Sequence, residues 1–146
     1  MTIKAHPEVA ATRTAADAVD LIGSTPVVEL AKFARGGARL LAKLEGYNPG
    51  GSVKDRIARA MIDDAERNGL LKKGGTIVEA TSGNTGVALA LVAAARGYRC
   101  VIVMPEGYGP VKAALVTASG GEVVRTPADG KIMAAIARAE EIVRST

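Results

Sequence analysis

The chain has 146 residues, 48% of them hydrophobic and 23% charged, and carries a net charge of +4. This length and composition favour a single globular domain with its own hydrophobic core. The basic residues are spread along the chain and are accompanied by three Tyr, one Phe and no Trp, so a nucleic-acid partner is not expected. The longest apolar run, residues 87–95, is too short to cross a bilayer, and no secretory signal is visible. We therefore expect no membrane contact and a cytoplasmic location.

Cysteine and histidine are too scarce for most side-chain chemistry. Cys100 is the only cysteine and lies in an apolar segment, so we predict a buried structural thiol and no internal disulfide. The only histidine, His6, lies in a polar leader, which argues against His-based catalytic triads and His-rich metal sites. Any reaction must therefore use Lys, Ser, Thr, Asn, carboxylates or a cofactor.

The predicted elements follow that polar leader. Residues 1–14 are interpreted as a mobile leader, followed by a short helix over residues 15–22 and strands over residues 27–30 and 38–44. Helices and strands then alternate as helix 53–68, strand 76–80, helix 84–96, strand 100–104, helix 110–119, strand 122–125 and helix 130–144.

This alternation predicts βαβ units and therefore an α/β fold, an open parallel twisted sheet with helices on both faces. Strands 76–80 and 100–104 are almost continuously apolar, so both are expected to be central strands that are covered on both faces. In such sheets ligands bind beyond the carboxyl ends of the strands. Two segments that lead into helices are unusual enough to be candidates for that role.

The first candidate is the stretch from Gly46 to Arg56, which reads G-Y-N-P-G-G-S-V-K-D-R. A phosphate-binding P-loop requires its lysine directly after the second glycine, but Ser52 occupies that place, so a P-loop is rejected. Ser52 and Asp55 have instead the spacing of a capping pair, in which the two side chains bind free backbone N–H groups at a helix start.

Lys54 lies three and four residues before Ile57 and Ala58, on the apolar stripe of the predicted helix, so it is expected to point toward the sheet. Burial and the positive end of the helix would both favour the neutral amine, which is the form that reacts with an aldehyde to give a Schiff base. The alternative is a frayed first turn, in which Lys54 extends into solvent and only Ser52 and Asp55 have a role.

The second candidate is the loop T-S-G-N-T-G, residues 81–86, which follows strand 76–80. Its glycines allow close backbone approach, and the start of the following helix offers free N–H donors to a carboxylate or phosphate. Gly83 and Gly86 alone do not make a dinucleotide-binding fingerprint. The alternative is a helix cap with a turn, where Ser, Thr and Asn are common.

Taken together, residues 48–56 and 81–86 closely resemble the cysteine synthase and cystathionine β-synthase family, which consists of pyridoxal-phosphate enzymes of fold type II. The segments 22–26, 96–98 and 104–106 also fit that family, and the cysteine synthase branch is the more similar. The resemblance extends from about residue 20 to residue 146. It implies that the chain holds the small N-terminal domain of the fold type II architecture.

The resemblance also implies roles for individual residues. Lys54 matches the lysine that forms the Schiff base with pyridoxal 5′-phosphate and later acts as acid and base at the substrate α-carbon. Asn84 matches the residue that binds the ring hydroxyl of the cofactor. The loop that binds the α-carboxylate of the amino-acid substrate corresponds to Thr81, Ser82, Gly83 and Thr85. The implied reaction is loss of acetate from O-acetylserine and addition of sulfide to give cysteine, with cystathionine β-synthase chemistry as the alternative.

Parts of the family pattern are missing. Members of the family are much longer, and their second half carries a Gly/Thr-rich loop for the cofactor phosphate, for which this sequence shows no equivalent. Ala80 stands where the family usually has proline, and residues 107–114 replace a segment that is usually rich in Ser, Glu and Arg. We therefore expect weak cofactor binding by this chain alone. A non-catalytic module that binds an anion or amino acid, or an inactive remnant, stays open as an alternative.

The same comparison predicts three segments. Residues 1–14 form the leader, residues 15–40 would pack on the missing second domain, and residues 41–146 form the α/β domain that carries Lys54 and the loop 81–86. Because residues 15–40 would lack their natural cover, we expect a homo-oligomer or a need for a complementary second half.

Overall fold

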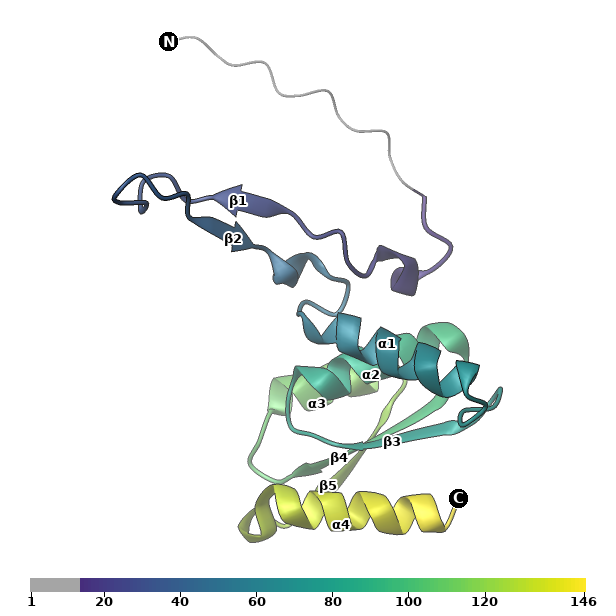
Figure 1. Ribbon diagram of the computed structural model, residues 1–146. Helices are drawn as coiled ribbons and strands as arrows, with labels where there is room; N and C mark the ends of the chain where they lie inside the picture. Colours follow the sequence, from purple (N-terminus) through teal and green to yellow (C-terminus); the bar gives the residue numbers. More distant parts are fainter. Residues whose placement is uncertain (1–13) are drawn as a thin grey trace.

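The computed structural model describes residues 14–146, so nearly all of the predicted leader lies outside the described residues. At the centre is a parallel sheet of β3 (Thr76–Ala80), β4 (Arg99–Pro105) and β5 (Glu122–Thr126), in the order β3-β4-β5. Helices α1 (Lys54–Arg67), α2 (Asn84–Arg96) and α3 (Pro110–Ala118) lie on one side of the sheet, and α4 (Lys131–Arg144) covers the other side (Figure 1). The predicted α/β class with helices on both faces is confirmed.

The central elements form where the sequence is most apolar. Six consecutive residues of β4, from Cys100 to Pro105, are buried, because α2 covers one face of this strand and α4 the other. Helix α2 is buried from Gly86 to Ala90 and ends at Gly97, which adopts the left-handed conformation (φ 74°) that glycine tolerates. The prediction of a central strand at residues 100–104 is therefore confirmed.

Strand β3 differs from this expectation. All five of its residues are only partly buried, and it pairs with β4 alone among the strands of residues 14–146. The prediction that residues 76–80 form a central, doubly covered strand is therefore wrong for this part of the chain, because β3 is an edge strand.

The two strands before α1 project away from the body of the molecule (Figure 1), whereas the turn that precedes them packs against α2 and buries Val19 and Ile22 in the core. The predicted helix over residues 15–22 is a short 3₁₀ turn, Ala18–Leu21, capped by the Asp17 carboxylate. Strands β1 (Val27–Glu29) and β2 (Leu41–Lys43) pair antiparallel and are shorter than predicted. Several apolar side chains of this hairpin are exposed, namely Val27, Val28, Phe33, Leu40 and Leu41.

A polar cluster, here called the N-terminal clasp, joins this segment to the loop before α1. It consists of Thr25, Glu45, Asn48 and Arg56. The Glu45 carboxylate accepts hydrogen bonds from the Arg56 guanidinium at 2.8 and 3.0 Å and from the Thr25 hydroxyl at 2.6 Å. The hydrogen bond from Arg56 is the main reason that the pKa of Glu45 falls to about 2. Asn48 Oδ1 accepts a hydrogen bond from the backbone N–H of Gly23 at 2.9 Å, so the clasp fixes both segments together.

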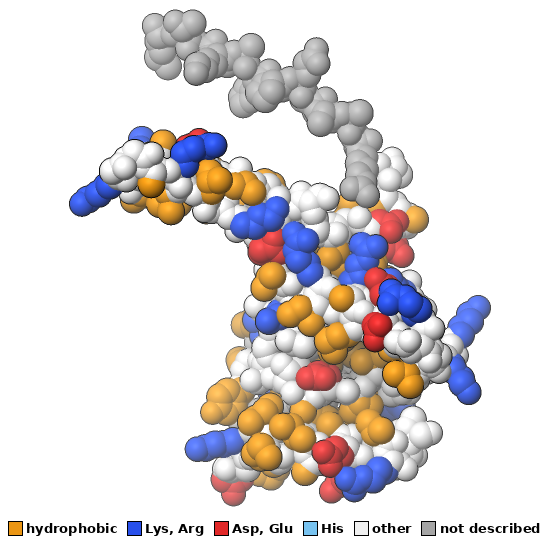
Figure 2. Space-filling model, viewed as in Figure 1, with side chains coloured by type: hydrophobic (Ala, Val, Ile, Leu, Met, Phe, Trp, Pro, Cys, Tyr) orange, Lys and Arg blue, Asp and Glu red, His pale blue; other side chains and the backbone are white. Residues whose placement is uncertain are grey.

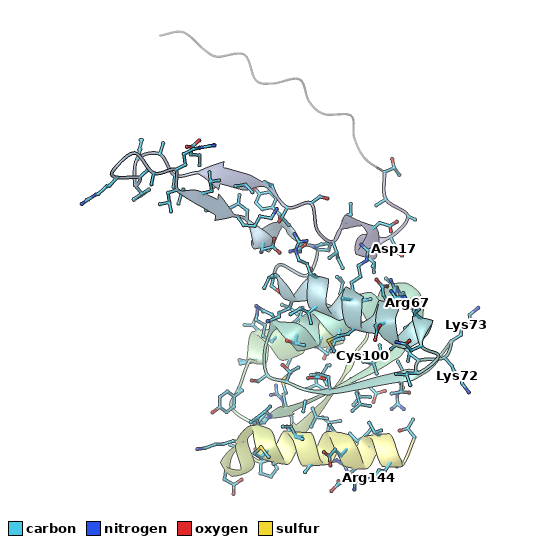
Figure 3. The ribbon with its side chains drawn as sticks, in the orientation of Figure 1. Asp17, Arg67, Lys72, Lys73, Cys100 and Arg144 are labelled. Carbon is cyan, nitrogen blue, oxygen red and sulfur yellow. The ribbon has the colours of Figure 1, made fainter. Side chains whose placement is uncertain are left out.

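Cys100 lies inside the body, between the sheet and the helices (Figure 3), and is 3% exposed. Burial raises the pKa of its thiol to about 11, which agrees with a structural role and not with a nucleophile. Within residues 14–146 no helix combines the length and apolar character needed to span a bilayer. The same residues contain no cluster of three or more His, Cys, Asp or Glu side chains suited to a metal ion.

Candidate active site

The loop before Lys54 is a tightly bonded turn. Asn48 is buried, and its side-chain amide donates to the backbone oxygens of Glu45 at 2.9 Å and Ser52 at 3.0 Å. Gly51 has a φ of 77° and donates its N–H to the Asn48 carbonyl at 2.8 Å, which closes the turn. These hydrogen bonds hold the backbone that leads to Lys54, the first residue of α1, in one conformation.

The Asp55 side chain holds this turn through a hydrogen bond to its backbone. Its carboxylate is fully buried and accepts a hydrogen bond from the Gly50 N–H, while Asp55 Oδ1 has no partner among residues 14–146. Burial raises the pKa of this carboxyl. A Cβ atom at position 50 would lie 2.5 Å from Asp55 Oδ1, so only glycine fits there.

The predicted capping pair has different partners from those expected. Ser52 Oγ accepts from the Lys54 N–H at 3.2 Å, and the Asp55 carboxylate binds Gly50, not a residue of the first helical turn. The N-cap position is occupied by Val53, which makes no side-chain cap. The capping prediction therefore holds for Ser52, which accepts from the N–H of the first residue of α1, and is wrong for Asp55, because its carboxylate binds the turn at Gly50.

Lys54 is the first residue of α1 and is half-buried. It shares a helix row, at spacings of four and eight residues, with Ala58 and Ile62, which are buried in the core. Ile57, which the sequence placed on the apolar stripe, is 41% exposed. Lys54 therefore heads the row that faces the core, but it is not fully buried as predicted. Its ammonium has no carboxylate within ion-pair distance among residues 14–146.

The loop of residues 81–86 links the carboxyl end of β3 to α2. Thr81 donates its N–H to the Val103 carbonyl at 3.0 Å, and the Thr81 hydroxyl accepts from the Gly83 N–H at 3.3 Å. At Gly86 a Cβ would lie 3.0 Å from side-chain atoms of Thr81 and Ile102, so glycine brings the helix close to the sheet. The first residue of the helix is Asn84.

The backbone N–H groups at the start of α2 are not capped by a side chain. Gly83 is the N-cap, and no side chain caps the helix. Ser82, Asn84 and Thr85 are half-buried, and their side chains have no hydrogen-bond partner among residues 14–146. The loop therefore presents backbone N–H groups, hydroxyls and an amide, which is a donor set suited to an anion. The alternative interpretation as a plain helix cap does not describe this arrangement.

The two candidate segments meet the same edge of the sheet. Helix α1 precedes β3 and α2 follows it, so both helices begin at the carboxyl end of the strands, and α1 packs on α2 (Figure 1). At the other end of this pair, Arg96 of α2 binds Glu66 of α1 at 2.9 Å, and the Tyr98 hydroxyl donates to the same carboxylate at 2.7 Å. These bonds tie the carboxyl end of α1 to that of α2, so the two helices are held side by side.

A hollow beside Ser82 was not predicted from the sequence. It has a volume of about 250 Å³ and is lined by Ser82, Pro105, Tyr108, Lys131 and Ile132. Lys131 has φ 48° and ψ −148°, a conformation otherwise found almost only in glycine. The rule that ligands bind at the carboxyl ends of parallel strands could have drawn attention to these residues, since they lie at or after the carboxyl ends of β3, β4 and β5.

Comparison with known proteins agrees with this geometry. Residues 19–146 match the sequence profile of the family described as "Pyridoxal-phosphate dependent enzyme". The chain therefore belongs to the family of pyridoxal-phosphate-dependent enzymes, as the resemblance had implied.

Within that family the chain is similar to a cysteine synthase of Flavobacterium sp., with 48% identity over 130 residues that cover 89% of this chain and 42% of the relative. It is 52% identical to the cystathionine β-synthase of Mus musculus over 118 residues, which cover 79% of this chain and 21% of the relative. Among solved structures, a cysteine synthase of Entamoeba histolytica has a TM-score of 0.89 at 33% identity, covering 98% of this chain and 44% of that chain. The chain thus spans less than half the length of these relatives.

Pyridoxal 5′-phosphate is the cofactor of this family. The residues described above fit part of that group. Lys54 offers a half-buried amine without a carboxylate partner, and residues 81–86 leave an open helix start, where even a Cβ on Gly83 would meet nothing within 4 Å.

Proposed function

We propose that this chain carries the lysine and the carboxylate-binding loop of a pyridoxal-phosphate-dependent β-replacement enzyme that acts on an activated serine. The proposed reaction joins sulfide to the three-carbon unit of O-acetylserine, with release of acetate, to give cysteine. The observation that carries the proposal is the common position of two helix starts at the carboxyl edge of the sheet, one with an amine and the other with an open donor set.

In this proposal Lys54 holds the cofactor through its amine and then moves the proton at the substrate α-carbon. Its place at the head of the core-facing row of α1 limits the paths open to the side chain, which is the preorganisation that such a step needs. When bound, pyridoxal phosphate supplies the electron sink for chemistry at that carbon. The buried carboxylate of Asp55 keeps the backbone of Lys54 in place and does not itself touch the reacting atoms.

Asn84 would donate its side-chain amide to the ring hydroxyl of the cofactor. Thr81, Ser82, Gly83 and Thr85 would bind the α-carboxylate of the substrate through hydroxyls and the backbone N–H groups at the start of α2. The positive end of that helix stabilises a carboxylate by about 0.3–1 kcal/mol in exposed settings, and by more when water is excluded. This arrangement selects amino-acid substrates by their carboxylate.

The phosphate of the cofactor would have to be bound outside residues 14–146. We propose that residues 15–40 pack on a second domain, present in the same polypeptide or supplied by another chain. The exposed apolar side chains of the β1–β2 hairpin support this assignment. Full activity would therefore require that complementary half.

Cystathionine β-synthase chemistry is the second candidate, favoured by 52% identity to the mouse enzyme of that name. It acts on an amino acid with the same carboxylate, but serine replaces O-acetylserine, so water leaves instead of acetate, and homocysteine is added instead of sulfide. A complex of this chain with the second half of the Flavobacterium cysteine synthase, assayed with O-acetylserine plus sulfide and with serine plus homocysteine, distinguishes the two. Cysteine formation supports the first proposal, and cystathionine formation supports the second.

The cofactor site is tested by reducing the protein with borohydride in the presence of pyridoxal phosphate and mapping the labelled peptides. We expect the label on Lys54, and its loss in Lys54→Ala. Label scattered over exposed lysines such as Lys72 and Lys73 would refute the assignment. A non-catalytic module would instead bind a free amino acid in a manner that depends on Asn84 but not on Lys54, whereas an inactive remnant would show neither binding nor label.

A further inference from the structure

The hollow beside Ser82 combines an apolar wall with polar side chains that have no partner. Pro105, Ile132 and the ring of Tyr108 contribute the apolar surface. Lys131, Ser82 and Tyr108 carry polar side chains, none of which forms a hydrogen bond or ion pair among residues 14–146. The volume of about 250 Å³ is several times the roughly 30 Å³ of a water molecule. A short aliphatic group with an anionic end matches both the apolar wall and the cation.

The charges around this hollow favour an anion. The Arg125 guanidinium donates to two backbone carbonyls at the end of β4 and in the loop that follows it, at 3.2 and 3.0 Å. Neither Arg125 nor Lys131 has a carboxylate within ion-pair distance among residues 14–146. The acidic residues of the flanking loops, Glu106 and Asp129, are exposed, and neither lines the hollow. A carboxylate that enters the hollow is therefore attracted more than it is repelled.

A buried hydroxyl next to the hollow also lacks a partner. Thr126 is 5% exposed, and its Oγ1 accepts and donates no hydrogen bond among residues 14–146. Thr126 lies opposite Pro105 in the parallel register, so both side chains point to the same face of the sheet. That face is the one covered by α4, because Val103, two residues before Pro105, belongs to a buried cluster with Ala135 and Ala139. Buried hydroxyls are normally hydrogen-bonded, so Thr126 marks this region as one that accepts a polar partner.

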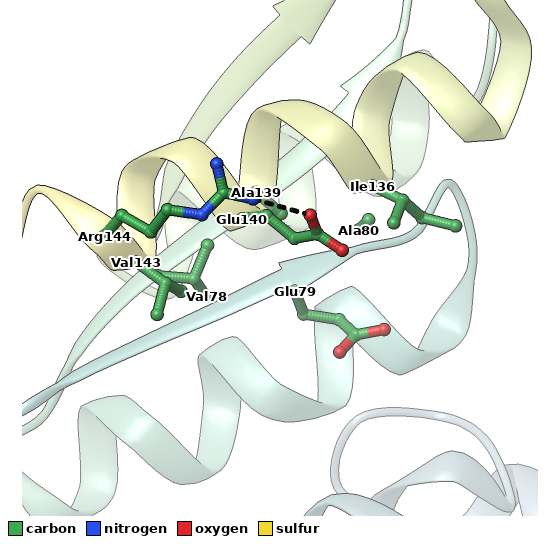
Figure 4. A pocket seen from close by; sticks show the side chains of 8 residues that line it. All are labelled: Val78, Glu79, Ala80, Ile136, Ala139, Glu140, Val143 and Arg144. Atoms are coloured by element: carbon green, nitrogen blue, oxygen red, sulfur yellow. Dashed lines mark hydrogen bonds and ion pairs between the residues drawn. The ribbon is translucent and has the colours of Figure 1, made fainter.

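The larger hollow between β3 and α4 does not offer a free cation (Figure 4). It has a volume of about 500 Å³, and hydrophobic side chains gather on the surface between α1 and α4 (Figure 2). The basic residue of its lining, Arg144, already binds the Glu140 carboxylate at 3.0 Å. Lys131 has no such partner among residues 14–146, so the hollow beside Ser82 is the better anion site of the two.

We propose that the hollow beside Ser82 is a second carboxylate-binding subsite, which recognises an acidic group at the end of the side chain of the amino-acid ligand. The inference rests on the proposed function, because Ser82 belongs to the loop assigned to the α-carboxylate and also lines the hollow. The two subsites are therefore adjacent, and a ligand with two carboxylates joined by a short aliphatic chain occupies both. Lys131 is the specificity-determining residue, since its ammonium attracts the distal carboxylate.

The distal acid has two possible sources in a β-replacement reaction. It belongs either to the acyl group that leaves the serine or to the thiol that replaces this group, because both are attached to the same β-carbon. The recognition chemistry is the same in the two cases, namely a carboxylate on Lys131 and a short chain against Pro105 and Ile132. The first experiment below tests this recognition, and the second distinguishes the sources.

Recognition is tested with three amino acids that share an α-carboxylate and a thioether. S-carboxymethylcysteine carries the distal acid, S-carbamoylmethylcysteine carries the neutral amide of the same shape, and S-methylcysteine carries neither. Each is titrated into the full chain, and binding is followed by the NMR shifts of backbone amides. We expect the acid to bind at least about fivefold more tightly than the amide, because only the acid pairs with the Lys131 ammonium. The amides of Tyr108 and Lys131 should shift with the acid but not with S-methylcysteine.

Variants of Lys131 make the result specific. Lys131→Gln should reduce the preference for the acid over the amide to less than about twofold, whereas Lys131→Arg should retain it. S-methylcysteine should bind both variants as it binds the wild type, which shows that the fold and the loop of residues 81–86 are intact. Lys73→Gln, at an exposed lysine outside the hollow, is the matched control and should keep the full preference.

The outcomes separate this inference from the proposed function. Equal affinities for acid and amide, together with binding of S-methylcysteine, would overturn the second subsite and leave the α-carboxylate loop standing. Absence of binding by all three amino acids would overturn both. A preference for the acid that survives Lys131→Gln would also overturn the inference, because the distal carboxylate would then bind elsewhere.

The source of the acid is determined with the complex of this chain and the second half of the Flavobacterium cysteine synthase. O-acetylserine plus mercaptoacetate gives S-carboxymethylcysteine and acetate, whereas O-succinylserine plus sulfide gives cysteine and succinate. Lys131→Gln should raise KM at least about fivefold for mercaptoacetate if the acid belongs to the thiol, or for O-succinylserine if it belongs to the leaving group. KM values for O-acetylserine and sulfide should not change. An unchanged KM for both acids would overturn the inference.

Discussion

Gly50→Ala is expected to destabilise the protein strongly. An ideal Cβ at this position would lie 2.5 Å from Asp55 Oδ1, 2.9 Å from Oδ2 and 3.0 Å from Cγ. The carboxylate cannot move aside easily, because Asp55 is fully buried. Either the turn opens or the carboxylate shifts, and both lengthen the hydrogen bond from the Gly50 N–H.

The magnitude follows from two destabilising contributions and one that offsets them in part. Overpacking costs about 1–3 kcal/mol, and weakening a hydrogen bond to a buried charged group costs about 1.5–3 kcal/mol. Replacing glycine by alanine restricts the unfolded chain, which offsets about 0.4–1 kcal/mol. We therefore expect the free energy of unfolding to fall by about 2–5 kcal/mol.

Urea unfolding of Gly50→Ala and Gly46→Ala measures this difference. Gly46 lies in the same loop, but a Cβ there would meet nothing within 4 Å, so this variant should stay within about 0.5 kcal/mol of the wild type. If the two variants unfold at the same urea concentration, the close contact between position 50 and the Asp55 carboxylate does not exist in solution. Borohydride labelling of Gly50→Ala, if it folds, should also fall at Lys54.

Three further outcomes are expected. The pKa of Glu45 is lowered from 4.5 to about 2, so its carboxylate stabilises the folded state fully above pH 4.5, and this stabilisation is lost as the pH falls toward 2. In Glu45→Gln the urea midpoint should therefore change less with pH between 4.5 and 2 than in the wild type. Lys131→Gly should raise stability by about 1 kcal/mol in thermal unfolding by removing an unfavourable backbone conformation, whereas Lys112→Gly within α3 should lower it by about 1 kcal/mol. Tyr98→Phe should lose about 1 kcal/mol with the hydrogen bond to Glu66, and an unchanged melting temperature would show that water replaces this bond.

The sequence predicted best where a local signal was strong. Strand 76–80 and helix 84–96 have the predicted bounds, because a polar loop rich in glycine separates two apolar runs and Gly97 ends the helix. The approach of Lys54 to the core could also be predicted, since its spacing to Ala58 depends only on helix geometry. Its exact depth could not be predicted, because that depends on what covers the first turn.

Other predictions failed for reasons that lie outside local sequence. The spacing of Ser52 and Asp55 predicts a capping box, but it cannot reveal that the buried turn at Gly50 competes for the same carboxylate. Periodicity placed Ile57 on an apolar stripe, yet burial also requires neighbours, and the described residues cover this side chain only in part. The apolar character of β3 likewise predicts a covered strand without saying which polypeptide covers it.

The N-terminal clasp separates two regions of very different rigidity. A two-stranded hairpin without a covering layer is marginally stable in water, so β1 and β2 should open often. The clasp lies between this hairpin and Lys54, and its charge-assisted hydrogen bonds join Arg56 to Glu45, neither of which belongs to the two strands. Opening of the β1–β2 hairpin should therefore not displace Lys54. The hairpin can move relative to the rest of the chain while Lys54 keeps its place at the start of α1.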